Sequence, residues 1–438
     1  MNEMQGDLSP HNCPCGREHV FSTQLVVEEG AITRLPALLS EKGIARVFLL
    51  ADRTTYGVAG HRVEQILTGE GVGVVSYVLP DDTPEPDEAN VGLAVMHLDP
   101  TVDAVVGVGS GVVNDIAKIV AHTASLPYWI VATAPSMDGY ASATSSMTVR
   151  GLKISVPSKS PDAILGDLDI LALAPMRMML SGLGDMLAKY VSIAEWRIAH
   201  LITGEYYCEQ VARLVRASLK KCTDNAVGLL SRDKEAVRAV FEGLVLCGAA
   251  MKLAGCSRPA SGVEHYFSHV WDMRGASLGT PVDTHGIQCA VGTYLAVSLY
   301  DRLRRMTPDR EHALCAVRAF DRDAWFATLT DFVGLGAQSM IALEEIEGKY
   351  DRSKHAARLD TILAHWQDIL AIIDEELPTL AALDTLYGTV GMPRTMAEIG
   401  IDPSILPTTF RATRDIRYKY VLSHLCYDLG LTEAVLDS

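Results

Sequence analysis

The sequence lacks the features that mark a membrane protein, a nucleic-acid-binding protein or an exported protein. It has no apolar run long enough to cross a bilayer, which takes about 20 residues. No basic stretch offsets the formal net charge of −16, which argues against nucleic acid as the main partner. The opening residues, MNEMQGDLSPHN, lack the basic and then apolar layout of a secretory signal. We therefore expect a cytoplasmic protein, and a small anionic substrate would need only a local positive pocket.

The sequence also lacks the regularly spaced, even-numbered cysteines of a disulfide framework. The nine cysteines are scattered and odd in number, which is typical of reduced thiols in a cytoplasm. The one cluster is CPCGREH, with Cys13, Cys15 and His19. A zinc knuckle takes a CxxC pair and a second pair of ligands. We therefore expect an N-terminal arm with free thiols at this position rather than a metal site.

The arrangement of apolar segments predicts two domains in the 438 residues, 48% of which are hydrophobic. Apolar runs predict strands, and helical patterns lie between them; the strands are 46–51, 72–79, 103–108 and 128–133, and the helices 59–69, 84–98 and 112–124. Alternating strands and helices favour a parallel sheet covered on both faces. The first domain is predicted to span residues 1–172.

After about Asp169 the pattern changes to long helical segments without a convincing strand. The predicted helices are 176–200, 204–223, 234–255, 259–272, 285–304, 309–333, 355–376, 378–388, 393–400 and 410–428. Residues 173–438 are therefore predicted to form an all-helical domain. The strongly charged segment 344–358 is interpreted as a solvated loop or helix face. The sequence shows no internal repeat and no low-complexity segment.

A glycine-rich turn, Gly107-Val-Gly109-Ser-Gly111-Val-Val-Asn-Asp115, follows a predicted strand and precedes a predicted helix. Glycines at a helix start let the backbone approach a phosphate, whose charge the free N–H groups and the positive helix end favour. The spacing is not GxGxxG, and glycines at such a turn can also serve steric needs alone. Asp52 and Thr133–Ser136 follow other predicted strands, and ligands of parallel sheets bind at these strand ends.

Three pieces of the chain carry side chains suited to a divalent metal. Asp185 lies in GLGDMLAK, although it could simply cap the helix it opens. In GVEHYFSH, His265 and His269 are four residues apart and share one face of a helix. His285, in THG, stands at a helix entrance. One carboxylate and two imidazoles suffice for a catalytic metal and leave positions open for substrate, whereas each histidine alone could be an ordinary packed or surface residue.

The segment from Thr133 to Met147 is rich in hydroxyl groups, which can donate to phosphate or ribose oxygens. It is interpreted as a loop just after a strand, and a plain surface loop is the alternative. Asp138 lies within it.

Together these motifs resemble one known superfamily. GSGVVNDIAK, TAPSMDGYAS, GLGDMLAK, GVEHYFSH and THG occur in this order, as in the superfamily of iron-type alcohol dehydrogenases, glycerol dehydrogenases and dehydroquinate synthases. The chain is most similar to the sn-glycerol-1-phosphate dehydrogenase branch of the bacterial AraM type. The resemblance covers roughly residues 20 to 300 and is weaker in the C-terminal third. Ser110 stands where many superfamily members have glycine, although serine is usual in the bacterial branch.

The resemblance implies a Rossmann-like N-terminal domain and a helical C-terminal domain, that is, a dehydroquinate synthase-like fold. It implies that Asp52 binds the ribose of NAD(P) and that the remaining nucleotide contacts come from Gly109, Gly111, Val112, Val113, Asn114, Asp115, Thr133, Ala134, Pro135, Ser136 and Ser142. Asp185, His265 and His285 match the metal ligands. Asp138, Asp185 and His269 match catalytic and substrate-binding residues.

The implied reaction is reversible, metal-dependent hydride transfer between NAD(P)H and dihydroxyacetone phosphate, which yields sn-glycerol 1-phosphate. Asp52 favours NAD because a carboxylate repels the 2′-phosphate of NADP, and neighbouring Arg53 could let NADP be tolerated. The resemblance suggests nickel or zinc, with iron also compatible, and a homodimer or larger assembly. Lys153, Lys159, Lys189 and Arg258 are candidates for binding the substrate phosphate.

Other functions remain open on the same motifs. One is glycerol dehydrogenase or a related polyol enzyme, and another is a dehydroquinate synthase-like cyclisation. A third is a non-catalytic protein that binds a nucleotide or senses a metal, against which the intact set of metal ligands argues.

Overall fold

A computed structural model describes residues 13–150 and 152–437, and these residues form two compact units. The first unit contains the described residues up to Met186 together with Arg213–Cys256. The second contains Leu187–Ala212 and the described residues from Ser257 onward. The opening residues, in which no export signal was predicted, lie outside the described part of the chain. The predicted domains 1–172 and 173–438 stay a prediction.

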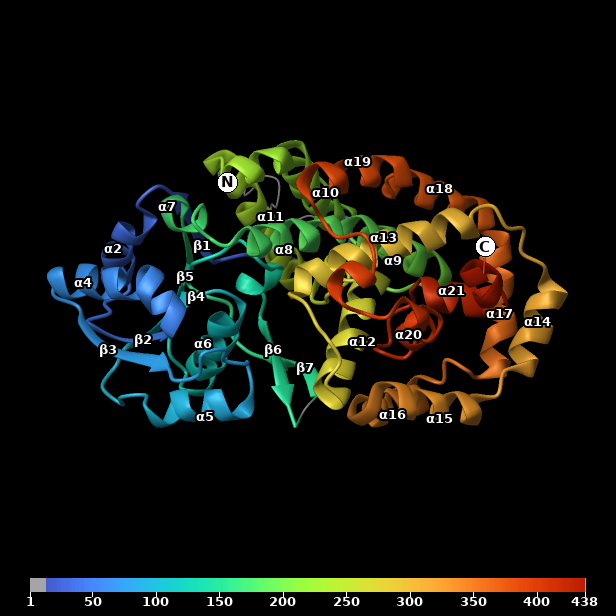
Figure 1. Cartoon of the computed structure of the whole chain (residues 1–438), viewed down its shortest axis with the longest axis horizontal. Coiled ribbons are helices and arrows are strands. Elements are labelled where there is room, and N and C mark those ends of the chain that lie inside the picture. The colour runs from blue at the N-terminus through green and yellow to red at the C-terminus, as the bar shows by residue number, and fades with distance from the viewer. Residues whose placement is uncertain (1–12, 151, 438) are drawn as a thin grey trace. The chain divides into compact units, whose positions relative to one another are not determined.

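The first unit is built on a six-stranded parallel sheet with the order β1-β8-β5-β4-β2-β3 (Figure 1). Its strands are β1 Gln24–Glu28, β2 Arg46–Asp52, β3 Gly73–Leu79, β4 Ala104–Gly109, β5 Tyr128–Ala132 and β8 Ala163–Asp167. The four predicted strands correspond to β2, β3, β4 and β5, whereas β1 and β8 were not predicted. Because β3 and β4 lie on opposite sides of β2, the sheet has a topological switch point between β2 and β4, where ligands of such sheets bind.

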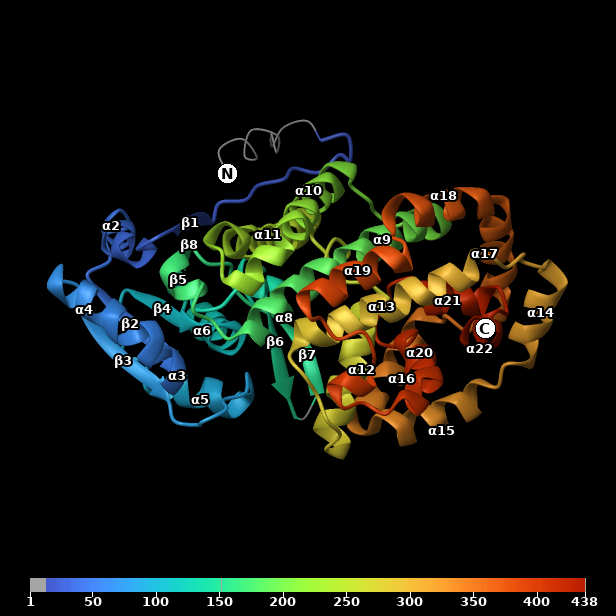
Figure 2. The ribbon, with the colours of Figure 1, turned by 45° about the horizontal axis from the view of Figure 1, so that its top comes forward.

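Helices cover both faces of this sheet, as predicted (Figures 1 and 2). The helical segments are η1 Ala31–Arg34, α2 Leu35–Ser40, α3 Arg53–Thr55, η2 Tyr56–Gly60, α4 His61–Gly69, α5 Glu88–Met96, α6 Gly111–Thr123, η3 Asp138–Tyr140, α7 Leu168–Leu171, α8 Met176–Leu187, most of α10 Glu209–Asn225, η4 Ala226–Ser231 and α11 Lys234–Ala254. Successive side chains of β4 point to opposite faces of the sheet. Val106 and Val108 pack in the cluster that contains α2 and α4, whereas a Cβ at Gly107 would lie 3.3 Å from Ala117 of α6.

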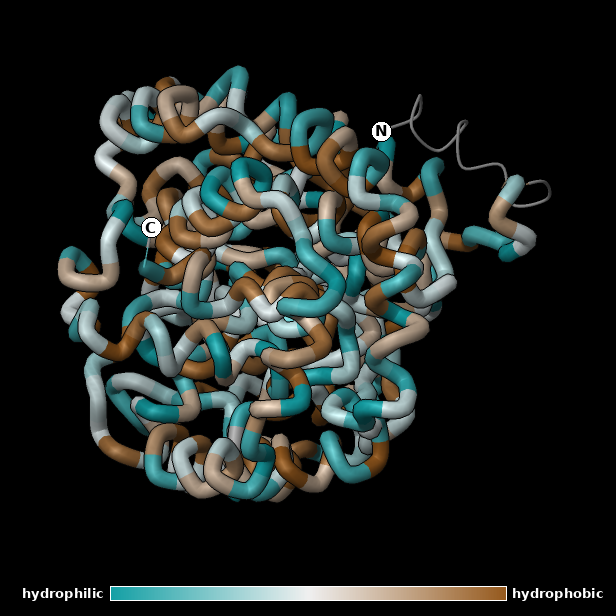
Figure 3. Tube along the Cα trace, turned by 90° about the vertical axis from the view of Figure 1, so that its right-hand side faces the viewer, coloured by the Kyte–Doolittle hydropathy of each residue, from teal (hydrophilic) through white to brown (hydrophobic). Residues whose placement is uncertain are grey.

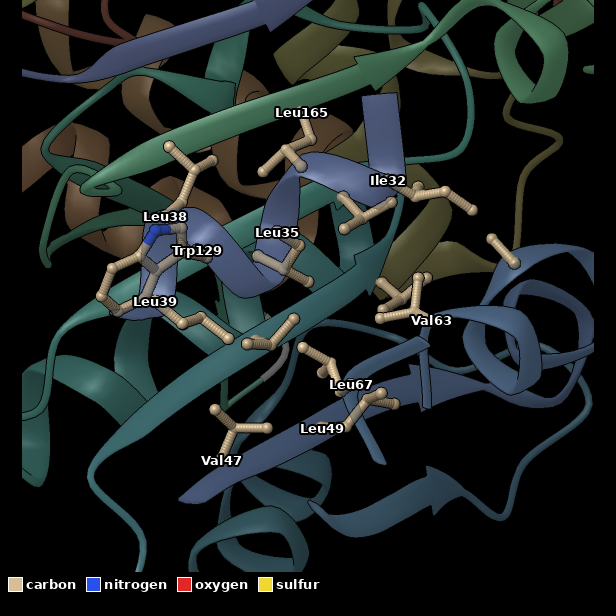
Figure 4. Close-up of a cluster of buried hydrophobic side chains, with 14 of the residues drawn as sticks. Ile32, Leu35, Leu38, Leu39, Val47, Leu49, Val63, Leu67, Trp129 and Leu165 are labelled. Atoms are coloured by element: carbon tan, nitrogen blue, oxygen red, sulfur yellow. The ribbon is translucent and has the colours of Figure 1, made fainter. Parts of the chain in front are cut away.

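The apolar core on the first face explains why this sheet forms. Leu35 and Leu39 from α2, with Leu67 from α4, pack onto alternate residues of the strands (Figure 4). These side chains are fully shielded from solvent. Each such leucine contributes about 1.5–3 kcal/mol through burial, so periodic apolar residues dictate both the strands and the helices that cover them.

A two-stranded antiparallel hairpin, β6 Thr144–Val149 and β7 Leu152–Pro157, extends from the first unit and is not part of the large sheet. The loop predicted to run from Thr133 to Met147 is therefore wrong beyond Ala143, because Thr144 to Met147 form a strand. Alternating hydroxyl and apolar residues in this segment suit a pleated strand.

The second unit is all-helical in its described residues, as predicted. Its helical segments are α9 Lys189–Thr203, α12 Val263–Leu278, α13 His285–Leu303, α14 Arg310–Ala319, α15 Arg322–Val333, η5 Gly334–Gly336, α16 Ala337–Glu347, α17 Arg352–Ala364, α18 Trp366–Glu376, α19 Leu380–Val390, η6 Ala397–Ile399, η7 Pro403–Ile405, α20 Leu406–Thr413, α21 Leu422–Asp428 and α22 Thr432–Asp437. Hydrophobic and hydrophilic segments alternate along the Cα trace (Figure 3), as amphipathic helices require.

Several predicted helices differ from the structure in their continuity. The helix predicted over 176–200 is divided at Ala188 into α8 and α9, and the one over 309–333 is divided into α14 and α15. The helix predicted over 393–400 is only the short segment η6. Helical periodicity alone does not register these breaks, since it persists across a one- or two-residue interruption.

The charged segment 344–358 is exposed at 345–347 and 351–354, as a solvated segment would be, but Glu344, Lys349 and Tyr350 are buried. Glu344 accepts hydrogen bonds from the backbone N–H groups of Lys349 (2.9 Å) and Tyr350 (3.1 Å). The Lys349 ammonium donates to the carbonyl of Arg414 at 3.0 Å, and Tyr350 donates to Asp415 at 2.8 Å. A buried polar network of this kind fixes the connection between α16 and α17.

One helical stretch, Arg322–Glu347, is long and apolar enough by length and composition to cross a membrane, which the sequence analysis did not identify. Gly334 interrupts it with φ 72°. The resulting helices α15 and α16 have 12 and 11 residues. At about 1.5 Å per residue, each is shorter than the roughly 30 Å hydrocarbon layer.

The glycine at position 182 is predicted to be indispensable for packing in the first unit. A Cβ there would lie 1.8 Å from the carbonyl oxygen of Pro135, which is rigid backbone. We expect Gly182→Ala to lower the free energy of unfolding by at least about 1–3 kcal/mol, as overpacking does. Gly92→Ala is the matched control, because a Cβ at this α5 position would meet nothing within 4 Å. Urea unfolding of both variants tests this, and equal stability would contradict it.

Candidate functional site

The glycine-rich turn joins the end of β4 to the start of α6 at the switch point of the sheet. Gly109 is the last residue of the strand and Gly111 the first of the helix. A Cβ at Gly109 would lie 2.5 Å from the Cβ of Val113, so glycine allows the helix to begin this close to the strand. The N–H groups of the first helical turn have no intrahelical partner and are suited to an anion.

The other predicted nucleotide contacts divide into exposed and buried residues. Val112 and Asp115 are partly exposed, whereas Val113 and Asn114 are buried. Asn114 accepts a hydrogen bond from the hydroxyl of Tyr128 at 3.1 Å. The side chains of Val113 and Asn114 therefore serve packing, and a nucleotide could meet only the backbone at these two positions.

The segment after β5 lies beside the glycine-rich turn. The hydroxyl oxygens of Ser110 and Ser136 are 2.6 Å apart, which links the ends of β4 and β5. Thr133 through Ser136 are all buried, and so is Ser142. The structure thus brings the segments 109–115 and 133–136 together at adjacent strand ends, as parallel strands require.

Lys118 is a buried cation that the sequence analysis did not identify. Its ammonium donates to the carbonyl of Gly139 (2.5 Å), the hydroxyl of Ser142 (2.9 Å) and the carbonyl of Thr144 (3.0 Å). Burial lowers the pKa of Lys118 from 10.5 to about 8, although the nearby carboxylates of Asp115 and Asp138 oppose the shift. The one signal in the sequence was its spacing from Gly111, since residues seven apart on a helix lie on the same face.

Asp52 ends β2 at the other side of the switch point. Its Oδ1 accepts the backbone N–H of Thr55 at 2.7 Å, and the Thr55 hydroxyl accepts the N–H of Asp52 at 3.1 Å. This capping box occupies one oxygen of the carboxylate and leaves the other for a ribose. The guanidinium of Arg53 lies 2.6 Å from Asp82, so its charge is paired with that carboxylate.

Asp185 lies in the last turn of α8 and is fully buried. Its Oδ2 accepts the backbone N–H of Asp138 at 2.9 Å. The alternative that Asp185 caps the start of a helix is wrong, because the helix begins at Met176. The structure instead ties the Asp185 carboxylate to the turn that carries Asp138, which is half-buried.

The second unit brings the three predicted histidines together. His265 and His269 lie on α12, and His285 is the first residue of α13. The ring centroids of His265 and His285 are 5.1 Å apart, and those of His269 and His285 are 6.0 Å apart. A Cβ at Gly292 would lie 2.4 Å from the carbonyl oxygen of Glu264. Glycine therefore lets the two helices approach closely enough for their histidines to cluster.

A carboxylate orients the imidazole of His265. The Oε1 of Glu264 lies 2.9 Å from His265 Nδ1 and also accepts the N–H of Gly262 at 2.7 Å. A proton on Nδ1 leaves Nε2 with its lone pair, which is the arrangement typical of a metal-binding histidine. The hydroxyl of Ser268 is 3.2 Å from His285 Nδ1 and can act in the same way.

A second buried carboxylate, that of Glu195, lies close to Glu264. Burial and the neighbouring charge of Glu264 raise the pKa of Glu195, although it accepts the N–H groups of Leu422 (2.8 Å) and Val263 (2.9 Å). Neither glutamate was identified from the sequence. Glu264 could have been, since it adjoins His265, but Glu195 lies 70 residues upstream and carries no local signal.

Cys289 is a further thiol that the sequence analysis did not assign to this cluster. Its sulfur lies 3.6 Å from His285 Nε2, and one ligand atom from each of Cys289, His265 and His285 lies within 4.8 Å of the others. Burial raises the pKa of the Cys289 thiol, whereas the imidazoles of His265 and His285 lower it. Their combined effect is the larger, so the pKa of Cys289 lies below its ordinary value. The i, i+4 spacing from His285 was the available signal.

The four basic candidates for a phosphate differ in their partners. The guanidinium of Arg258 is buried against Glu205 (2.6 Å) and also donates to the carbonyl of Tyr420 at 2.9 Å. Lys189 is fully buried and donates to the carbonyl of Ala260 at 3.1 Å. Lys159 donates to the carbonyl of Leu126 at 2.8 Å. Lys153 is half-exposed on β7.

Comparison with known proteins identifies relatives over most of the chain. The family model for iron-containing alcohol dehydrogenase matches residues 26–175. A glycerol-1-phosphate dehydrogenase [NAD(P)+] of Halalkalibacterium halodurans is 34% identical over 293 residues, which covers 66% of this chain and 73% of that protein. A glycerol-1-phosphate dehydrogenase [NAD(P)+] of Geobacillus stearothermophilus is 28% identical, with 92% of both chains covered.

Solved structures match the fold. A glycerol dehydrogenase from Schizosaccharomyces pombe superimposes with a TM-score of 0.63 at 18% identity and covers 96% of this chain and 91% of its own. An NADH-dependent butanol dehydrogenase from Thermotoga maritima gives a TM-score of 0.59 at 17% identity, with 94% and 98% covered. The predicted fold, a Rossmann-like domain with a helical domain, is confirmed.

Lys118 provides a pH-dependent test of the site's construction. Between pH 8 and 10.5 the unfolded chain binds this proton more tightly than the folded chain, so the stability of the wild type rises with pH in this window. We expect Lys118→Met to lower the free energy of unfolding by about 1–3 kcal/mol, because it leaves buried acceptors unpaired. The gap to the wild type should widen above pH 8. Urea unfolding at several pH values checks this, and parallel profiles would contradict it.

Proposed function

Because the chain belongs to the glycerol-1-phosphate dehydrogenase family, we propose that it reduces dihydroxyacetone phosphate reversibly to sn-glycerol 1-phosphate. The reaction uses NAD(P)H and a divalent metal. The observation that carries the proposal is the 34% identity over 73% of a glycerol-1-phosphate dehydrogenase. The nucleotide turn in the first unit and the histidine cluster in the second are the chemical features that this activity needs.

We propose Asp185, His265 and His285 as the ligands of the metal. The donor set of one carboxylate and two imidazoles suits nickel, zinc or iron(II), and nickel or zinc is our preferred assignment. Glu264 supports this role, since its contact with Nδ1 keeps Nε2 of His265 available as a ligand. When bound, such an ion polarises the C2 oxygen of the substrate, and NADH supplies the hydride.

The chain's own residues bind and orient the reactants. The backbone at 109–115 is proposed to hold the pyrophosphate, and Asp52 to hold the ribose through its uncapped oxygen. Asp138 and His269 orient the phosphorylated triose and move the proton of its C2 hydroxyl, through water where they do not reach it directly. Lys118 positions the loop that carries Asp138 by binding the carbonyl of Gly139 at 2.5 Å.

An oxidation assay of NADH with dihydroxyacetone phosphate tests the reaction. Metal-free protein is refilled with zinc, nickel or iron(II), and the chirality of the product is determined. We expect turnover only after refilling and only the sn-1 product. Failure to reduce the phosphorylated triose with all three metals, while NADH still binds, would support a nucleotide-binding protein instead. Oxidation of glycerol alone would favour a glycerol dehydrogenase.

Substitution of the proposed ligands should separate catalysis from nucleotide binding. Asp185→Asn keeps an acceptor for the N–H of Asp138 but removes the charge, and His285→Ala removes an imidazole. We expect each to lower kcat/KM for dihydroxyacetone phosphate by at least about a hundredfold, because Lewis-acid stabilisation is worth several kcal/mol. Metal content should fall while the Kd of NADH stays within a few-fold. Glu311→Gln is the control, because Glu311 is an exposed residue of α14. Unchanged activity of the ligand variants would refute the assignment.

Cofactor preference tests the role of Asp52. Asp52→Asn keeps the acceptor for Thr55 N but removes the charge that repels a 2′-phosphate. We expect the ratio of kcat/KM for NADPH to that for NADH to rise roughly tenfold, equivalent to about 1.4 kcal/mol. Thr55→Val disturbs the same capping box without a charge change and should leave the ratio alone. A wild type with a large preference for NADPH would overturn the role of Asp52.

A further inference from the structure

A second cluster of metal-binding side chains lies in the N-terminal arm that leads to β1. Cys13, Cys15 and His19 each offer a ligand atom, and these atoms lie within 4.8 Å of one another. Cys15 Sγ is 3.2 Å from His19 Nε2. The arm is separate in sequence from the residues proposed for catalysis. The expectation of an arm without a metal rested on the CxC spacing, which differs from that of a zinc knuckle.

A tight turn brings the two cysteines to the histidine. The N–H of Gly16 donates to the carbonyl of Cys13 at 2.9 Å. Gly16 has φ 76°, a left-handed conformation that glycine adopts readily. The turn spans residues 13–16 and so contains both cysteines, and His19 lies four residues after Cys15. A structural zinc site takes several thiolate or imidazole ligands around one ion, and this turn holds the two cysteines near each other.

The imidazole of His19 is oriented as a ligand would be. His19 is buried, with 3% of its surface exposed. Its Nδ1 lies 3.0 Å from the carbonyl oxygen of Leu253. A carbonyl oxygen only accepts hydrogen bonds, so Nδ1 carries the proton and Nε2 presents its lone pair toward the sulfur of Cys15. Metal-binding histidines are held in their tautomer by this kind of contact.

The same arm caps the end of α11. The guanidinium of Arg17 donates to the carbonyl of Ala254 at 2.8 Å, and Leu253 and Ala254 are the last residues of that helix. Carbonyls at a helix end have no intrahelical partner. Capping alone accounts for Arg17 and for Nδ1 of His19. It does not account for the two thiols whose sulfur atoms lie close to this imidazole, and neither cysteine forms a disulfide.

We propose that Cys13, Cys15 and His19 bind a structural divalent metal of the zinc class. Zinc binds thiolate at about 2.3 Å and imidazole at about 2.0 Å, which places neighbouring ligand atoms within the spacing found here. Water or another thiolate fills the fourth position. Thiolate sulfur and imidazole nitrogen select such ions over magnesium or calcium. The metal fixes the N-terminal arm on the end of α11, and the proposal does not depend on the proposed function.

Metal stoichiometry tests the proposal on the full-length protein. Protein purified from zinc-supplemented medium should hold one equivalent beyond the catalytic metal. The double variant Cys13→Ser with Cys15→Ser should lose that equivalent and keep the other, whereas Asp185→Asn should show the reverse loss. The matched control is Cys222→Ser with Cys315→Ser, which also removes two thiols. A Cys13, Cys15 double variant that holds as much metal as the wild type would overturn the site.

Cobalt substitution gives a spectroscopic signal of thiolate coordination that can be measured without enzyme activity. Cobalt(II) bound by cysteine has a thiolate-to-metal charge-transfer band, which carboxylate and imidazole ligands do not produce. We expect the band in the wild type and in Cys289→Ser, since Cys289 belongs to the histidine cluster. We expect His19→Gln to weaken it and the Cys13, Cys15 double variant to abolish it. A band that disappears only in Cys289→Ser would place the thiolate ligand there and contradict the proposal.

Thiol reactivity in the wild type needs no variant. Cys315 is exposed and should react with a thiol reagent at once. Cys13 and Cys15 are partly exposed but should react only after a chelator removes the metal, because a coordinated thiolate is a weaker nucleophile. Labelled peptides identified by mass spectrometry distinguish these residues. Immediate labelling of Cys13 and Cys15 before chelation would contradict the proposal.

Discussion

Close backbone contact through glycine is the constraint on which the construction of the candidate site depends. In the first unit a Cβ at Gly182 would meet the carbonyl oxygen of Pro135 at 1.8 Å, so α8 lies directly against the segment after β5. This proximity lets Asp185 accept the N–H of Asp138. In the second unit Gly292 plays the same part between α12 and α13. Both glycines are needed because a side chain would not fit between the packed backbones, and neither has a positive φ.

The polar groups of the site are held by other polar groups rather than by packing alone. Glu264 orients His265, and its own oxygen is fixed by the N–H of Gly262. In the first unit Lys118 gathers a carbonyl, a hydroxyl and a second carbonyl around one buried ammonium. Such networks are costly to bury unless each member has a partner. They therefore define one arrangement of the loops that carry the reactive side chains.

Local sequence pattern predicts only those parts of this protein whose burial repeats along neighbouring residues. The strands β2 to β5 and the shared helix of His265 and His269 follow from periodicity, because burial imposes a repeat on neighbouring residues. The edge strand β1 and its neighbour β8 were missed because their pairing joins residues more than 130 positions apart. Glu195 was missed for the same reason, since its contacts with Val263 and Leu422 exist only in the folded chain. The orientation of His19 in the N-terminal arm depends on the carbonyl of Leu253, which lies 234 positions away in the sequence and has no local signal.

The position of the catalytic metal is the claim on which the proposed function depends most. Crystals of the full-length protein, grown with nickel or zinc, allow an anomalous difference map to be recorded on either side of the metal's absorption edge. We expect an edge-dependent peak bonded to the carboxylate of Asp185 and to ring nitrogens of His265 and His285. A fully occupied metal bound elsewhere, with these three side chains uncoordinated, would contradict it.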